Sequence, residues 1–158
     1  MRFTHLALPF FSALVFSGSA AAFELKGISP GAGIDTVDRT ACRALKNADS
    51  DMPGYSCATT FGGAPAVMEL SVADQKIVSI QVSVERQVMG SVLNALEEKY
   101  GKSSKPNRYI EDYRWKSGAK RLSIEEDRIS SGYIVFAADM SLYLAFTNKK
   151  KETAKGDL

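Results

Sequence analysis

Two cysteines, Cys42 and Cys57, are the most nucleophilic side chains in the body of the chain. A catalytic cysteine needs a nearby base, and the one histidine of the chain is His5. Because His5 lies in a predicted export leader, a catalytic thiol would lack that base. An even number of cysteines in an exported chain instead favours a disulfide between the two. The chain-entropy model gives such a bridge a stabilising contribution of about 3 kcal/mol.

Acidic side chains are the next candidates for chemistry. Without histidine, general acid–base catalysis would need carboxylates with shifted pKa values, and a glycosidase-like pair must face each other across a cleft. The candidates are Glu69, Glu85, Glu111 and Asp112. Nothing in the sequence singles them out, and such residues are more typical of charges on the solvent side of a sheet. The sequence therefore predicts no catalytic residue, no metal ligand and no cofactor, with a small carboxylate-dependent hydrolase as a minor alternative.

Aromatic side chains recur at alternate positions of residues 109–115. Alternate residues of a strand share a face, so three aromatic rings would line one side and Arg114 the other. Such rings are typical either of core packing or of a protein-binding surface, in which Tyr, Trp and Arg are enriched. Two further rings, which flank a glycine-rich turn, allow the same two interpretations. The candidate protein-binding residues are Tyr55, Phe61, Tyr109, Tyr113, Arg114 and Trp115.

The first 22 residues have the pattern of a secretory signal peptide. Arg2 supplies positive charge, residues 6–16 form an apolar core, and Ala20–Ala22 offer a small-residue cleavage site. The apolar run is shorter than the ~20 residues that span a bilayer. We therefore expect a soluble mature protein, 23–158, that begins at Phe23 and is periplasmic or secreted.

Net charge excludes one large class of partners. The chain has 20 basic and 18 acidic residues, and removal of the leader takes away one basic residue, so the mature chain is close to neutral. A nucleic-acid-binding protein needs a concentrated basic face to neutralise phosphates. No second apolar stretch approaches the length of a membrane span. The expected partner is therefore another protein, not nucleic acid or a membrane, and the oligomeric state stays open.

The periodicity of apolar residues predicts the elements that hold these side chains. Spacings of three and four predict helices over 33–46 and 85–99. Alternation of apolar and polar residues predicts strands over 55–61, 66–72, 78–84, 109–115, 120–125, 133–137 and 140–146. Polar or glycine-rich turns fall between strands at 62–65, 73–76 and 126–132.

This order of elements predicts an α+β fold with two helices packed on an antiparallel sheet. One helix and three strands, then one helix and three or four strands, form tandem halves over 28–85 and 86–147. We expect a single domain over 23–147, in which the two sets of strands are able to join into one sheet. A flexible charged tail follows at 148–158. The disulfide would tie the first helix to the first strand.

Two short motifs resemble segments of known exported proteins. Gly27-Ile28-Ser29-Pro30-Gly31, followed by Val37, resembles the turn that enters the first helix of outer-membrane assembly lipoproteins of the BamE (SmpA/OmlA-like) type. The stretch 95–102, with Trp115 on the next strand, is similar to a segment of small exported α+β proteins. Tandem helix–sheet halves also occur in secreted β-lactamase-inhibitor proteins. The resemblance implies helices backing a sheet that binds rather than catalyses, although Phe23 stands where the lipoproteins carry a lipidated cysteine.

Export, a small disulfide-linked scaffold and the lack of a catalytic set together predict a non-enzymatic protein-binding module. One form of this prediction is an inhibitor or immunity protein against an envelope-acting enzyme or toxin. The alternative is an accessory protein of outer-membrane assembly or envelope stress. Binding would use an open sheet face or the loops at 47–55, 62–65 and 126–132.

Overall fold

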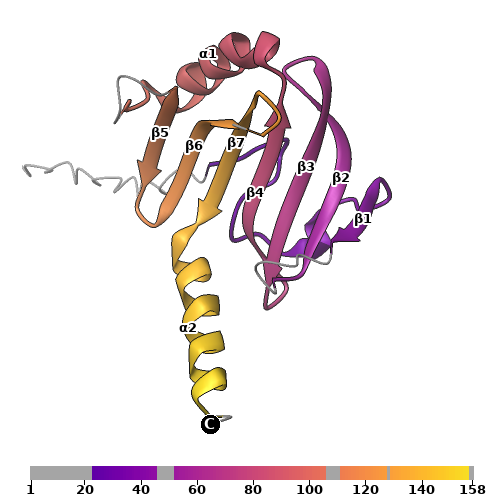
Figure 1. Ribbon diagram of the computed structural model, residues 1–158, viewed down its shortest axis with the longest axis vertical. Helices are drawn as coiled ribbons and strands as arrows, with labels where there is room; N and C mark the ends of the chain where they lie inside the picture. Colours follow the sequence, from indigo (N-terminus) through magenta and orange to yellow (C-terminus); the bar gives the residue numbers. More distant parts are fainter. Residues whose placement is uncertain (1–22, 46–51, 106–110, 128, 157–158) are drawn as a thin grey trace, which may run out of the picture.

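The computed structural model describes residues 23–45, 52–105, 111–127 and 129–156 (Figure 1). The predicted leader, 1–22, lies outside the described residues. The strands are β1 (Cys42–Leu45), β2 (Gly54–Phe61), β3 (Ala64–Ala73), β4 (Lys76–Val84), β5 (Asp112–Ser117), β6 (Lys120–Asp127) and β7 (Gly132–Asp139). The helices are α1 (Met89–Tyr100) and α2 (Met140–Gly156), with short 3₁₀ turns η1 (Ile34–Thr36) and η2 (Arg86–Val88).

The seven strands of the described chain form one antiparallel sheet in the order β1-β2-β3-β4-β7-β6-β5 (Figure 1). Strands β4 and β7, which are distant in sequence, pair along the middle of the sheet from Ser79–Ala138 to Val84–Tyr133. This pairing joins the strands of the two predicted halves into a single sheet. The predicted α+β class, with two helices and an antiparallel sheet, is confirmed.

Helix α1 covers one side of the sheet. Its buried residues Met89, Val92 and Leu96 lie at spacings of three and four, so they form one apolar stripe. The stripe belongs to the same core cluster as the fully buried strand residues Ile80 and Leu122. The core therefore lies between α1 and the sheet, on the side to which alternate strand residues project.

The segment before β1 covers the same side of the sheet. Phe23, Ile34 and Val37 are members of the core cluster. The ring of Phe23 packs edge-on against Tyr100 of α1, with centroids 5.2 Å apart. The backbone N–H of Glu24 donates to the hydroxyl oxygen of Tyr100 at 2.8 Å. The start of the described chain is thereby fixed to the end of α1.

The hairpins are tighter than predicted. The predicted connection over 73–76 has only Asp74 and Gln75 unpaired, since the flanking residues pair with each other. The connection predicted over 62–65 is likewise reduced to Gly62 and Gly63. All four turn residues have positive φ, as a two-residue type I′ turn requires. Glycine adopts this conformation at little cost, which explains the glycine pair.

The predicted helix over 33–46 is wrong. Its residues form the single turn η1, an extended segment and the edge strand β1. Val37 already has extended backbone angles, with φ −97° and ψ 127°. The N–H of Thr40 then donates to the side chain of Asp38 at 3.0 Å. Short polar side chains compete with helical hydrogen bonds in this way, and this local turn directs the chain into β1.

The predicted strand over 140–146 is also wrong, because these residues begin helix α2. The side chain of Asp139 accepts hydrogen bonds from the N–H groups of Ser141 and Leu142, at 3.0 and 3.3 Å, and so caps the helix. Residues 148–156, predicted as part of a tail, continue the helix. The structure has two helices, the number predicted. Helix α1 matches the helix predicted over 85–99, whereas α2 follows the last strand and no long helix precedes the first strand in the described chain.

Candidate functional site

The side of the sheet opposite α1 is far less covered than the α1 side. Residues directly paired across antiparallel strands project to the same side. On the α1 side, one such row is at most 1% exposed: Leu70, Ile80, Ala137 and Leu122. The neighbouring row on the other side is buried only at its serine: Glu69, Gln81, Phe136, Ser123 and Arg114. We call the side that carries this second row the open face.

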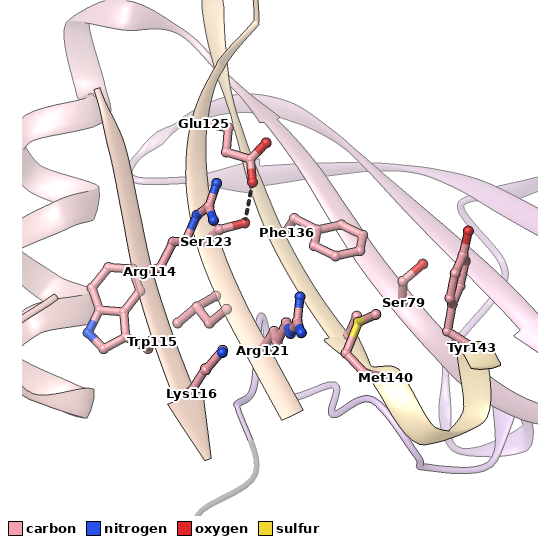
Figure 2. A pocket seen from close by; sticks show the side chains of 12 residues that line it. Ser79, Arg114, Trp115, Lys116, Arg121, Ser123, Glu125, Phe136, Met140 and Tyr143 are labelled. Carbon is pink, nitrogen blue, oxygen red and sulfur yellow. Dashed lines mark hydrogen bonds between the residues drawn. The ribbon is translucent and has the colours of Figure 1, made fainter. Parts of the chain in front are cut away.

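A groove of about 580 Å³ lies on the open face where α2 begins (Figure 2). Residues from β4, β5, β6, β7 and α2 line it, so it exists only because the two halves of the sheet are joined. Its charged lining residues are Arg114, Lys116, Arg121 and Glu125. Its main apolar side chains are Phe136, Met140 and Tyr143. We call this feature the β7–α2 groove.

The apolar part of the β7–α2 groove is built at the junction of β7 and α2. Phe136 projects from β7, and Met140 and Tyr143 stand beside it on the first turns of α2 (Figure 2). Helix α2 contacts β4, β6 and β7. Tyr143 is 43% exposed, and Phe136 is only half-buried. Apolar surface is therefore available to a ligand at this end of the groove.

The cationic part of the groove lies on β5 and β6. Arg114 forms an ion pair with Asp112 at 2.6 Å, and this hydrogen-bonded contact raises the pKa of Arg114 above its ordinary value. Lys116 and Arg121 are exposed and directly paired across β5 and β6. Among the described residues, neither of these two cations has a hydrogen-bond or ion-pair partner. Their positive charges in the groove are therefore not neutralised by another described side chain.

Glu125 supplies the one carboxylate that lines the groove. It accepts a hydrogen bond from the hydroxyl of Ser123 at 3.0 Å, and it is exposed (Figure 2). The groove thus combines three cations, one acceptor carboxylate and an apolar floor. Such an arrangement favours recognition of a mixed acidic and apolar ligand.

The described aromatic residues of the predicted site on 109–115 lie on the α1 side of the sheet, and Arg114 lies on the opposite side, as the alternation predicts. Trp115 is 5% exposed and lies in the core, where its indole N–H donates to the carbonyl of Gly101 at 2.7 Å. Tyr113 is half-buried against the core, with the ammonium of Lys105 over its ring at 5.2 Å. Of this set only Arg114 lies on the open face, and Tyr109 lies outside the described residues.

The other two predicted binding residues lie far from the groove, on β2. The hydroxyl of Tyr55 accepts a hydrogen bond from Arg39 at 3.1 Å, and Phe61 packs against the core at the end of its strand. The five predicted residues that the structure describes are therefore divided between β2 and β5. The groove residues Arg121, Phe136 and Tyr143 are absent from the prediction. One signal could have found Phe136: it alternates with buried Val135 and Ala137, so an aromatic ring must project to the opposite side.

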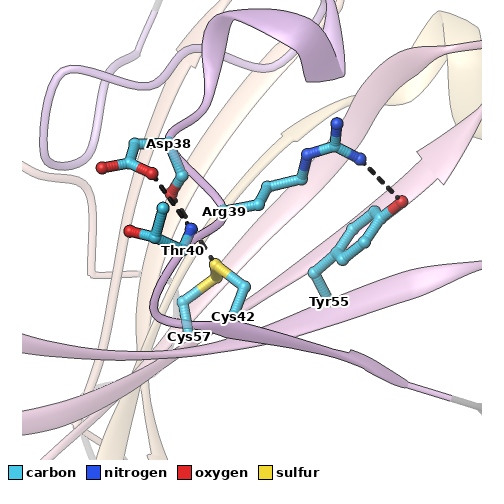
Figure 3. Close-up of a disulfide and its surroundings, with 6 residues drawn as sticks. All are labelled: Asp38, Arg39, Thr40, Cys42, Tyr55 and Cys57. Carbon is cyan, nitrogen blue, oxygen red and sulfur yellow. Dashed lines mark hydrogen bonds between the residues drawn. A yellow bond between two sulfur atoms is a disulfide. The ribbon is translucent and has the colours of Figure 1, made fainter.

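The predicted disulfide between Cys42 and Cys57 is confirmed (Figure 3). The two cysteines are directly opposite each other in the register of β1 and β2, with Cα atoms 4.0 Å apart. The bridge therefore joins two neighbouring strands, and the prediction that it ties a helix to a strand is wrong. At this position the bridge covalently attaches the short edge strand β1 to β2.

The predicted acidic candidates do not converge. Glu69 and Asp112 are on β3 and β5, with β4, β7 and β6 between them, and Asp112 is engaged by Arg114. Glu85 and Glu111 lie outside these strands. Among the residues that the structure describes, no three His, Cys, Asp or Glu side chains gather in a metal-binding arrangement.

A polar cluster at the other end of β7 has a structural role. Arg86 donates to the hydroxyl of Tyr133 at 3.1 Å and to Glu126 at 2.6 Å, and the Tyr133 hydroxyl donates to Glu111. The hydrogen bond to Glu111, together with burial, raises the pKa of Tyr133 to about 12. Tyr133 is 3% exposed, whereas Arg86 and Glu126 are exposed, so the cluster links η2 to the sheet at the surface of the protein.

The fold and the groove together define a class: an α+β protein whose antiparallel sheet is covered by a helix on one side and open on the other. Compared with protein-family models, curated proteins and solved structures, the chain gives no match. The resemblance to assembly lipoproteins and inhibitor proteins therefore stays a prediction. Within the described residues, no helix combines the length and the apolar character needed to cross a bilayer.

Proposed function

We propose that the protein is exported and binds another protein, without chemical turnover, through its open face. The observation that carries the proposal is the contrast between the two sides of the sheet. The α1 side forms a dry core, whereas the open face presents exposed cations and a half-buried aromatic ring in a groove. Aromatic side chains, methionine and arginine are the residue types enriched in protein interfaces.

Export is supported by the disulfide and by the leader pattern. Disulfides form and persist mainly in oxidising compartments such as the periplasm and the cell exterior. The bridge between Cys42 and Cys57 fits such a compartment. In its sharper form, the proposal makes the protein an inhibitor or immunity protein, and its partner an envelope-acting enzyme or toxin.

Photocrosslinking in the native envelope tests the proposal. The full chain is expressed with a photoreactive amino acid in place of Gln81, on the open face, or of Glu98, which is exposed on α1. We expect a discrete adduct with one protein from the Gln81 position and none from the matched Glu98 position. The captured protein is then purified and its activity measured with and without a stoichiometric amount of this chain.

Two results would contradict the proposal. The first is the same adduct pattern from both positions, because binding would then not involve the open face. The second is turnover of a substrate by the purified protein alone. A captured enzyme that loses activity on mixing would support the inhibitor form. Unchanged activity with a stable complex would leave binding in place and remove the inhibitor form.

A further inference from the structure

We infer that the β7–α2 groove binds an acidic segment of the partner protein and that one apolar side chain of that segment packs on Phe136. This inference rests on the proposed function, since it names the chemistry of the partner at the open face.

The charge of the groove is predominantly positive. Arg114, Lys116 and Arg121 line it against the single carboxylate of Glu125. The guanidinium of Arg114 is partly occupied by Asp112, whereas the other two cations have no such partner among the described residues. A carboxylate on the ligand would find two unpaired cations, and charge complementarity of this kind steers association and fixes register.

The register places like charges directly opposite each other. Lys116 on β5 pairs with Arg121 on β6, on the open face. Like charges in directly paired positions destabilise a sheet, because their Cβ atoms are only about 5 Å apart. An acidic side chain seated between them would remove this repulsion. The free protein therefore carries an unfavourable pair that an anionic ligand makes favourable.

The apolar floor sets the second requirement on the ligand. Phe136 lies on the strand next to that of Arg121, and Met140 and Tyr143 project from the start of α2 beside them (Figure 2). Neighbouring strands are about 4.8 Å apart, so the cations and the ring are within reach of side chains a few residues apart on one segment. An aromatic or aliphatic anchor fits here, since Phe136 and Tyr143 offer flat apolar surface and the flexible side chain of Met140 adapts to the group beside it.

Glu125 limits where the ligand can carry negative charge and offers an acceptor to peptide N–H groups. Its carboxylate is exposed in the groove and accepts hydrogen bonds, so it suits the N–H donors of a peptide. The same carboxylate would repel a phosphate or an acidic side chain placed beside it, so the acidic side chains of the ligand belong at Lys116 and Arg121. The combination of cations, one acceptor and an aromatic floor therefore favours a peptide over a nucleic acid.

Three short peptides and the full chain test the inference. The first peptide is a hexapeptide of glutamates and aspartates with one central phenylalanine; the second replaces the phenylalanine with alanine; the third replaces the acids with lysines. Binding is followed by NMR shifts of backbone amides up to millimolar peptide. We expect the first peptide to perturb β5–β7 and the start of α2, the second to bind about tenfold more weakly, and the third not to bind.

A matched pair of charge reversals locates the site. Arg121→Glu should weaken binding of the first peptide at least about tenfold. Arg43→Glu should not, because Arg43 is an exposed arginine on the far edge strand β1. Arg121→Gln should in addition raise the urea midpoint of the free protein, since it removes the repulsion by Lys116. A simple folding role for Arg121 would lower that midpoint.

Several outcomes would overturn the inference. Two concern the peptides: no NMR shift at millimolar acidic peptide, or equal binding of the acidic and the basic peptide. A third is an equal loss of peptide affinity in Arg121→Glu and Arg43→Glu. The fourth is tighter binding of inorganic polyphosphate than of the acidic peptide. If the crosslinked partner from the envelope still binds Arg121→Glu fully, this inference fails while the proposed function stands. If the Gln81 probe captures nothing, the proposed function fails whatever the peptides do.

Discussion

Arg114 and Trp115 are neighbours in the chain and lie on opposite sides of the sheet. The indole of Trp115 is in the core, and the guanidinium of Arg114 faces the groove. The two-residue period of a strand dictates this separation. The same period predicts the rings on one side of this strand and Arg114 on the other, so the candidate binding residues of the strand do not share a face. The alternation identified Arg114 correctly as a residue of the opposite phase.

Asp139 shows how one side chain joins several elements. Its carboxylate caps α2 and lies 3.0 Å from the ammonium of Lys120, which also donates to the carbonyl of Pro30. Burial by itself raises the pKa of Asp139. The hydrogen bond and charge of Lys120 and the two capping N–H groups outweigh burial, so the pKa is lowered from its ordinary value of 3.8.

The lowered pKa of Asp139 predicts an acid-sensitive contribution to stability. Since the folded pKa is below the unfolded value, the stabilisation is complete above about pH 3.8 and is lost as the pH falls through the lowered pKa. We expect Asp139→Asn to lower the free energy of unfolding at neutral pH by about 2 kcal/mol. Urea denaturation at a series of acidic pH values should show that the difference in unfolding free energy between this variant and the wild type becomes smaller as the pH falls. Asp35→Asn, at an exposed position of η1, is the control and should show no such difference. A difference that stays constant across these pH values would contradict the prediction.

At the scale of elements, α2 shows how a short apolar pattern misleads. Met140, Leu142, Leu144 and Phe146 alternate, which is the pattern of a strand. The residues between them are also largely apolar, so the run fits either period. The cap by Asp139 and the high helix propensity of the Met, Leu, Ala and Lys residues decide for the helix. No side chain of α2 up to Thr153 is buried, so packing does not impose either period.

Strand β1 is a short edge strand that depends on its bridge to β2. It has four residues, and among the described strands it pairs only with β2. In the folded state the disulfide joins positions that the register already holds together. Its main effect is therefore on the unfolded chain, in which it closes the loop between the cysteines.

Removal of the bridge is expected to destabilise the protein without changing the sheet. The Cys42→Ala/Cys57→Ala double variant should lose about 3 kcal/mol of unfolding free energy, because its unfolded chain gains conformational freedom. Urea denaturation of the oxidised wild type, the reduced wild type and the double variant measures this loss. The reductant should have no effect on the double variant. Equal midpoints for the oxidised and reduced wild type would refute the prediction.

At the scale of the whole molecule, the pairing of β4 with β7 makes one sheet from two stretches of chain. The core cluster runs across this seam, from Met68 and Leu70 on β3 to Leu122 and Ile124 on β6. Residues of α1 and of the segment before β1 belong to this same cluster, so one core serves both sets of strands. A single core of this kind is what the prediction of one domain over 23–147 requires.

This continuity predicts that the two sets of strands unfold together. Trp115, the only tryptophan, reports on the β5–β7 end through its fluorescence, while far-ultraviolet circular dichroism reports on the whole sheet. We expect the two signals to give coincident urea transitions, as a two-state domain does. Two transitions, with the fluorescence change separated from the loss of strand signal, would show that the halves are independent.

The sequence by itself determined the features that depend on local periodicity. Alternation over 66–84 identified β3 and β4, the stripe before Gly101 identified α1, and the even cysteine count indicated the disulfide. Each of these follows from neighbours a few residues apart, for which the two- and 3.6-residue periods are decisive.

The tertiary structure alone decided where the groove is and which residues form it. Arg121, Phe136 and Tyr143 meet only because β6, β7 and α2 come together beside β4. That meeting depends on pairing between strands far apart in the chain, about which local periodicity carries no information. The tertiary structure also decided that the residues from Met140 onwards form a helix. Their sequence fits both the helical and the strand period, and Asp139 at the end of β7 supplies the cap that favours the helix.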